Sequence, residues 1–207
     1  IFLTRDCGKS WTKITNGIPD THFTRCLRAD KKRPGLLYCG TEYGMYISYD
    51  YGKNWKPFQL NLPMVPITDL TIKNNDLVVA TQGRSFYILD DLGVVQNLDD
   101  NVTQKDLYVF PVEDAYRMDG QQNLEVKNAG INPPNGVVIN YFLKDVKDSS
   151  LVKIFILDKD KKIISTFSTK PSGDTAKIEV SKNMNQFVWD LHYTPAEKIE
   201  GMLMRSG

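Results

Sequence analysis

An all-β chain built of two successive parts is the fold that the sequence predicts. Three observations predict it. A turn motif of eight residues occurs twice at a spacing of 44 residues, strand-length apolar runs alternate with turn residues, and a polar stretch near residue 100 separates two patterns of strands. Because repeats of ~40–50 residues that carry several strands each are typical of propellers, each copy of the motif predicts one blade.

The motif has the form S/T-x-D-x-G-x-x-W, at residues 4–11 (TRDCGKSW) and 48–55 (SYDYGKNW). Its Asp carboxylate can accept hydrogen bonds from backbone N–H groups of its own turn. Its Gly supplies the positive φ of a tight turn, and its Trp begins the next strand with a large ring to bury. We therefore expect a structural role, not catalysis, for the eight motif residues: Thr4, Asp6, Gly8, Trp11, Ser48, Asp50, Gly52 and Trp55.

The first part, residues 1–112, is predicted to be a β-propeller fragment of two to three blades. Residues 1–20 give the outer hairpin of one blade. The predicted strands of the next two blades are 23–29, 36–41, 45–48 and 55–60, then 67–72, 77–80, 86–89 and 94–98. A propeller closes with ~4–8 blades, so further N-terminal blades of the same polypeptide are the expected partners of this fragment.

The second part, residues 136–207, is predicted to be an immunoglobulin-like or fibronectin-like β-sandwich, after a linker at residues 113–135. Its short strands recur every 10–15 residues, as is typical of such sandwiches. The predicted strands are 137–143, 152–157, 162–169, 176–180 and 186–191. Trp189 is expected in the core, and the absence of a strand pattern after residue 195 indicates an incomplete sandwich.

The two octets resemble the Asp-box (BNR) repeats of sialidases, sortilin-type propellers and many secreted bacterial proteins. Residues 37–48 (LYCGTEYGMYIS) resemble the usual lead-in LYAGT-x-x-G-x-Y-x-S. Residues 77–91 (LVVATQGRSFYILDD) form a third, decayed copy without a Trp, similar to VVATHGRSFWILDD in sortilin-like bacterial proteins often labelled glycosyl hydrolases. Gln82 and Tyr87 stand where that pattern has His and Trp. The resemblance extends to the sandwich, through N-x-F-x-W-D-L at residues 185–191. It implies the C-terminal part of a secreted or periplasmic protein whose signal peptide lies elsewhere.

Composition and charge exclude several classes of protein. Hydrophobic residues make up 41% of the chain and charged residues 25%, as in globular domains. The net charge of +1 gives no electrostatic case for binding nucleic acid or an acidic membrane, and no apolar run is long enough to span a bilayer. No glycine-rich phosphate loop and no Cys/His cluster occurs, so neither a cofactor nor a metal is expected.

The three cysteines leave two alternatives open. Cys26 and Cys39 lie on consecutive predicted strands and could pair. A direct cross-strand disulfide is strained, however, and Cys39 fills a position where the repeat has a small Ala, so free thiols are the favoured alternative.

The sequence favours a binding module over an enzyme. A sialidase-type site needs an arginine cluster, a Tyr–Glu nucleophile pair and an acid Asp from different blades. The residue types occur at four positions: Glu42, Tyr43, Asp69 and Arg84. The arginine element RIP is missing, two to three blades cannot assemble a central site, and the two histidines, His22 and His192, fall in different parts.

We therefore expect a non-catalytic, extracellular or periplasmic binding or scaffold module for carbohydrate or protein. The alternative is a fragment of a glycoside hydrolase, sialidase-like or BNR-type, whose catalytic residues lie mostly in missing blades. The candidate ligand-binding residues occupy equivalent positions in successive blades: Glu42, Tyr43, Arg84, Ser85 and Phe86. Their structural alternative is packing between blades, with Arg84 bridging carbonyl groups near the central channel.

Overall fold

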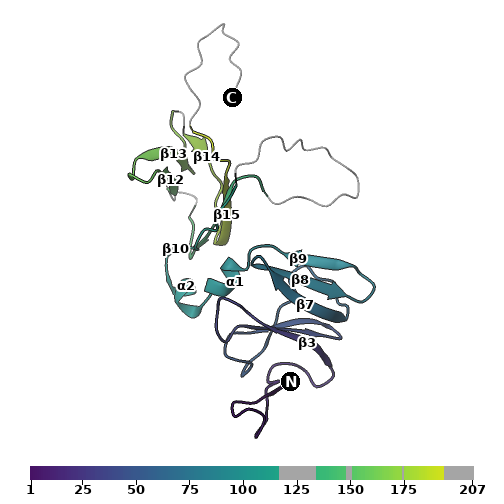
Figure 1. Ribbon diagram of the computed structural model, residues 1–207. Helices are drawn as coiled ribbons and strands as arrows, with labels where there is room; N and C mark the ends of the chain where they lie inside the picture. Colours follow the sequence, from purple (N-terminus) through teal and green to yellow (C-terminus); the bar gives the residue numbers. More distant parts are fainter. Residues whose placement is uncertain (117–133, 148–150, 174, 194–207) are drawn as a thin grey trace. The chain divides into compact units, whose positions relative to one another are not determined.

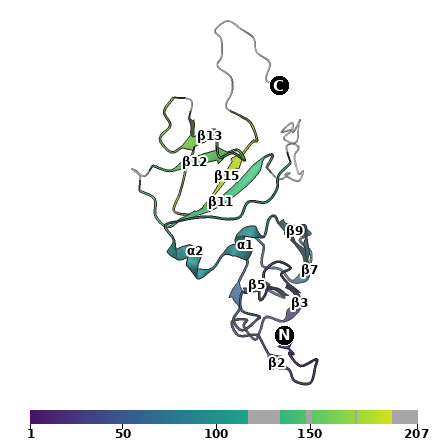
Figure 2. The ribbon, with the colours of Figure 1, turned by 60° about the vertical axis from the view of Figure 1, so that its left-hand side comes forward.

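The computed structural model describes residues 1–116, 134–147, 151–173 and 175–193, and is shown in Figures 1 and 2. About 40% of these residues are in strands, with two short helices and several small, mainly antiparallel sheets. The all-β expectation is confirmed at this level. The chain divides into two compact units, Ile1–Asn97 and Leu98–Gly207.

The first unit contains three antiparallel sheets. β1 (Phe2–Leu3) and β2 (Thr12–Lys13) form a hairpin. The second sheet has the order β3 (Thr24–Ala29), β4 (Leu37–Thr41), β5 (Gly44–Ser48) and β6 (Lys56–Pro57). The third has the order β7 (Ile67–Lys73), β8 (Asp76–Thr81) and β9 (Phe86–Leu89). The four-stranded sheet predicted for residues 23–60 is thereby confirmed, as are three strands of the next.

The four-stranded sheet is covered on both faces, because successive residues of a strand point to opposite sides. Tyr38 and Met45 face sheet β7–β9, where a core forms with Ile67, Leu70 and Val79. On the opposite face, Cys39, Tyr46 and Trp55 pack with Ile18 of the preceding segment. Full burial of each large apolar side chain contributes ~1.5–3 kcal/mol, so these two clusters hold the unit together.

The strand predicted for residues 94–98 is wrong, because these residues lie in and beside a helix, α1 (Gly93–Asn97). The Asp91 carboxylate accepts a hydrogen bond from the Gly93 amide at 2.8 Å, which starts the helical turn. The Gln96 side chain donates to Asn75 at 2.8 Å and to the Asp30 carboxylate at 3.0 Å. These tertiary hydrogen bonds override the β preference of the two valines, and sheet β7–β9 has three strands.

In its described residues, the second unit contains α2 (Asp100–Gln104), capped by Asp99, and two sheets. One has the order β10 (Leu107–Val109), β11 (Val137–Leu143) and β15 (Asn183–Trp189), all antiparallel. The other joins β12 (Lys153–Leu157) to β13 (Ile163–Ser168), and β13 in parallel to the short β14 (Ala176–Lys177). The predicted hairpin around residues 158–161 is confirmed.

One sequence-based boundary and one expected core residue differ from the structure. β10 pairs with β11, so residues 107–109 belong to the second unit although the sequence placed them in the first part. Trp189, expected in the core, is half-buried, and its indole N–H donates to the carbonyl of His192 at 3.2 Å. The ring of Phe187 packs instead on that of Phe167, with centroids 4.6 Å apart. Most of the predicted linker, residues 117–133, and residues 194–207 lie outside the described residues.

Candidate functional site

The first motif turn, residues 4–11, is held by the carboxylate of Asp6. It accepts hydrogen bonds from the Ser10 amide at 2.8 Å, the Ser10 hydroxyl at 2.6 Å and the Thr4 hydroxyl at 2.9 Å. Thr4 Oγ1 in turn accepts from the Gly8 amide at 2.8 Å. These are the contacts to its own turn that the motif predicts, and they leave this carboxylate fully engaged.

The second turn repeats the same network around Asp50. Its carboxylate accepts from the Asn54 amide at 2.9 Å, the Asn54 side chain at 2.7 Å and the Ser48 hydroxyl at 2.8 Å. Ser48 Oγ accepts from the Gly52 amide at 2.9 Å. A side chain on Gly52 would clash with Ile14 and would need φ +81°, so glycine is required here for two reasons.

The carboxylates of both motif turns remain ionised at neutral pH. Hydrogen bonds from the Ser10 side chain and amide, and from Thr4, lower the pKa of Asp6 to about 2. For Asp50, partial burial acts to raise the pKa, but the hydrogen bonds from Asn54 and Ser48 outweigh it and the pKa is lowered. A carboxylate with a lowered pKa is a poor general acid, so neither residue suits acid catalysis.

The two motif tryptophans differ. Trp55 is buried, and its indole N–H donates to the carbonyl of Ile14 in the preceding repeat at 2.9 Å. Trp11 is 60% exposed, and its indole N–H donates to Gly8 of its own turn at 3.1 Å. The prediction that Trp11 is a core residue is therefore wrong. Its indole rests on its own turn, whereas Trp55 has residues 14–18 of another repeat to pack on.

A cluster of aromatic and charged side chains gathers at the turn between β4 and β5. The ring of Tyr43, 52% exposed, lies 4.8 Å from that of His22 between centroids, with 30° between the planes. His22 Nδ1 also lies 2.8 Å from the Tyr46 hydroxyl. Burial raises the pKa of Tyr46, so its hydroxyl stays protonated and can donate to the imidazole.

The charged members of this cluster are Arg25 and Glu42, whose side chains form an ion pair at 2.6 Å. The Glu42 amide donates to the Phe23 carbonyl at 3.0 Å, which joins the turn to the residues before β3. The Phe23 ring is 70% exposed. We call the five residues His22, Phe23, Arg25, Glu42 and Tyr43 the Tyr43 cluster. An open pocket lies beside it, lined by Lys13, Thr15, Ile18, Pro19, Asp20, His22, Phe23 and Thr24.

The Tyr43 cluster can hold a ligand that has both an apolar face and hydroxyl or charged groups. Exposed rings offer apolar contact area, and the guanidinium and carboxylate offer hydrogen-bond donors and acceptors. Sequence reasoning expected Glu42 and Tyr43 here but missed His22 and Phe23. Neither residue carries a sequence signal of its own, because the path of the chain before β3 brings both to this turn.

The other predicted ligand residues lie on the turn between β8 and β9. The Ser85 carbonyl accepts hydrogen bonds from the Thr81 hydroxyl at 2.6 Å and the Thr81 amide at 3.2 Å, and Ser85 has φ 64°. Arg84 and Phe86 are exposed. Within the described residues, no hydrogen bond or ring contact joins this turn to the Tyr43 cluster, and the Arg84 side chain donates no hydrogen bond to a carbonyl group. The cluster therefore forms at the turn between β4 and β5, whereas the turn between β8 and β9 is a plain hairpin.

The three cysteines are free thiols, so the disulfide alternative is wrong. Cys26 stands opposite Gly40 in the β3–β4 register, not opposite Cys39. The two cysteines also belong to the clusters on opposite faces of the sheet. Burial raises the pKa of Cys39 to about 12.

Comparison with protein-family models finds no matching family, and comparisons with curated proteins and with solved structures find no significant match. In the described part of the chain, no three His, Cys, Asp or Glu side chains gather closely enough to hold a metal ion. No helix among the described residues has the length and apolar character needed to cross a membrane.

Proposed function

We propose that this chain is a non-catalytic binding module that recognises carbohydrate through the Tyr43 cluster. Two exposed rings, Phe23 and Tyr43, lie at the same end of a single sheet as the Arg25–Glu42 ion pair. This combination of aromatic and charged side chains is the observation that carries the proposal. Sugars present C–H faces and hydroxyl groups together, and a rigid aromatic surface beside fixed polar groups complements both.

The proposed scaffold is part of an Asp-box β-propeller followed by an immunoglobulin-like sandwich. Backbone hydrogen bonds that repeat at the 44-residue interval support it. The Ile14 amide donates to Ile1 and the Phe58 amide to Met45. The Ile18 amide donates to Thr15 and the Leu62 amide to Gln59. Further blades of the same polypeptide and a secreted or periplasmic location complete this proposal, and both rest on the Asp-box resemblance.

The carboxylates considered for catalysis argue against an enzyme. Asp6 and Asp50 hold their own turns. Glu42 is paired with Arg25, and Asp69 with Arg28 at 2.6 Å. A glycosidase needs two carboxyl groups flanking one substrate bond, one of them protonated, whereas the pKa values of Asp6 and Asp50 are lowered and Glu42 and Asp69 are each held by an arginine.

The test combines a glycan array with titration of the best glycan by NMR. We expect Tyr43→Ala to weaken binding about fivefold without changing the melting temperature, since the ring is exposed and stacking contributes ~1 kcal/mol. Tyr116→Ala, an equally aromatic change at an 84% exposed position, is the matched control and leaves binding unchanged.

Two results would contradict the proposal. Binding of a peptide ligand, with no glycan bound, would assign the cluster to protein recognition. Turnover of an aryl glycoside that disappears in Glu42→Gln would make the chain a glycoside hydrolase.

A further inference from the structure

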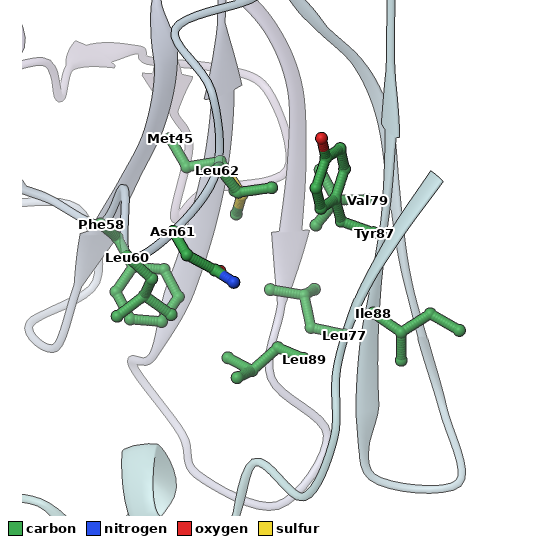
Figure 3. Close-up of a pocket in the computed structure, with 10 residues that line it drawn as sticks. All are labelled: Met45, Phe58, Leu60, Asn61, Leu62, Leu77, Val79, Tyr87, Ile88 and Leu89. Atoms are coloured by element: carbon green, nitrogen blue, oxygen red, sulfur yellow. The ribbon is translucent and has the colours of Figure 1, made fainter. Parts of the chain in front are cut away.

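An apolar pocket of about 80 Å³ lies between the loop after β6 and sheet β7–β9. Figure 3 shows its two sides facing each other: Met45, Phe58 and Leu62 on one, and Leu77, Val79 and Leu89 on the other. We call it the Leu62 pocket. It shares no residue with the Tyr43 cluster.

The first repeat shows what occupies the equivalent position. Residues 14–18 and 58–62 follow the two Asp-boxes at the same interval and have the same backbone hydrogen bonds. Against residues 14–18 lies the indole of Trp55, packed with Ile18 and Cys39. The Trp55 N–H donates to the Ile14 carbonyl at 2.9 Å.

The residues around the Trp55 indole have direct counterparts in the Leu62 pocket. Ile1 and Ile18 correspond to Met45 and Leu62 at an interval of 44 residues. Leu37 and Cys39 correspond to Leu77 and Val79 at an interval of 40. All four counterparts line the pocket.

No tryptophan fills this second position, because the third copy of the motif lacks one. At the interval of 40 residues, Trp55 corresponds to Val95, which is in helix α1 and is half-buried against the core. The loss of an indole relative to the preceding interface thus accounts for an apolar pocket at this place.

We propose that the Leu62 pocket binds a small planar aromatic molecule of the indole class. Its lining is apolar apart from Asn61 and the Tyr87 hydroxyl (Figure 3), so it favours an apolar ring over water. The volume of about 80 Å³ receives one part of such a ring, and the rest lies on the side that is open to solvent. The Phe58 carbonyl is the counterpart of the Ile14 carbonyl and accepts the ring N–H. The ligand enters as a free small molecule from the side that is open to solvent.

Titration of the whole chain with indole, followed by ¹H–¹⁵N NMR, tests the proposal. We expect shifts confined to residues around Leu62 and Val79 and a Kd of roughly 1 mM, reasonable for so small a ligand. Replacing the N–H by N–CH₃, in 1-methylindole, weakens binding about three- to tenfold, as loss of one hydrogen bond does.

Variants locate the site. Leu62→Trp, which fills the pocket, and Leu89→Phe, which narrows it, should each abolish binding. Phe2→Ser changes a 62% exposed ring outside the pocket lining and leaves binding intact. No shift at the solubility limit of indole, or binding that survives both filling variants, would overturn the proposal.

Trp55→Val gives an independent test, because it places in the second repeat the residue type, valine, that stands at the corresponding position 95 of the third. It should open an equivalent pocket and raise the stoichiometry of indole from one to two, with the new site next to Ile18. If the Trp55→Val protein folds but still binds only one indole, the Leu62 pocket does not arise from the missing tryptophan of the third repeat. If this variant does not fold, the filling variants decide the question alone.

Discussion

The indole N–H of Trp55 donates to the carbonyl oxygen of Ile14 at 2.9 Å, across 41 residues of sequence. The Trp55 amide also donates to Asn16 at 2.8 Å, and the side chains of Asn16 and Asn54 are joined at 2.8 Å. Three hydrogen bonds therefore connect the second Asp-box to the segment that follows the first. Trp55 therefore joins neighbouring repeats and also fills a core.

Trp55→Ala should destabilise the first unit by ~3–5 kcal/mol, as truncation of a buried aromatic residue does. Trp11→Ala removes the same ring from an exposed position and should cost under ~1 kcal/mol. Urea unfolding followed by circular dichroism compares the two. Equal losses of stability would show that the burial of Trp55 does not govern its contribution.

Asp50→Ala removes the acceptor of three hydrogen bonds and should cost ~1–3 kcal/mol. Asp50→Asn keeps one carbonyl oxygen as an acceptor and should cost less. The same urea experiment measures both, and hydrogen exchange of the Asn54 amide reports the turn directly. If the Asn54 amide of Asp50→Ala exchanges freely while the free energy of unfolding is unchanged, the effect is confined to the turn. That result would contradict the expected loss of stability.

Acid should weaken the first unit between pH 4 and pH 2. The pKa of Asp6 is about 2 in the folded chain and ~3.9 in an unfolded one, so its ionised form favours folding. This contribution is complete above pH 4 and is lost as the pH falls through the folded pKa. Asp6→Asn should flatten the dependence of the urea midpoint on pH in this range. An identical slope in the variant would rule out Asp6 as a source.

The positions of the turns and strands of the first unit could be predicted because they rest on local chemistry. Asp6 and Asp50 hold residues four positions away, and Gly8 and Gly52 adopt the positive φ expected of them in the same turns. Helix α1 could not be predicted, because Gln96 bonds to Asp30, 66 residues earlier. The exposure of Trp11 was missed for a related reason: the motif is the same in both copies, and the residues that cover the ring belong to another repeat.

Gly40→Ala should destabilise the first unit by ~1–3 kcal/mol through overpacking. An added Cβ would lie 2.6 Å from both Cys26 Sγ and Ile67 Cγ2, where the two sheets meet. Gly83→Ala is the contrasting control, since its Cβ would meet nothing within 4 Å and only the φ of +82° resists the change. The melting temperature of Gly40→Ala should be lower than that of Gly83→Ala. The reverse order would contradict close packing at Gly40.

Gln96→Leu should loosen helix α1 and cost ~1–3 kcal/mol, because the Asp30 carboxylate and the Asn75 side chain lose a donor in a half-buried place. Asp30 keeps its bonds to the Arg33 amide and the Tyr38 hydroxyl, so the turn before β4 should persist. Hydrogen exchange that rises at residues 93–97 but not at 30–36 is the expected pattern. Uniform exposure of both segments would show that they open together.

The Tyr43 cluster was predictable only in part. Glu42 and Tyr43 are marked by their place between two strands of a repeat, whereas Arg25 meets Glu42 only because β3 pairs with β4. His22 carries no sequence signal of its own, and its ring contact with Tyr43 follows from the path of the chain before β3.

The three thiols differ sharply in accessibility. Cys39 is buried with a pKa of about 12, burial also raises the pKa of Cys26, and Cys7 is exposed on the first Asp-box turn. A maleimide dye at neutral pH would therefore attach at one position without any engineering. That position is four residues before Trp11, whose indole quenches many fluorophores on contact. The chain thus supplies its own labelling site and quencher, so that opening of a single turn can be followed by fluorescence in solution.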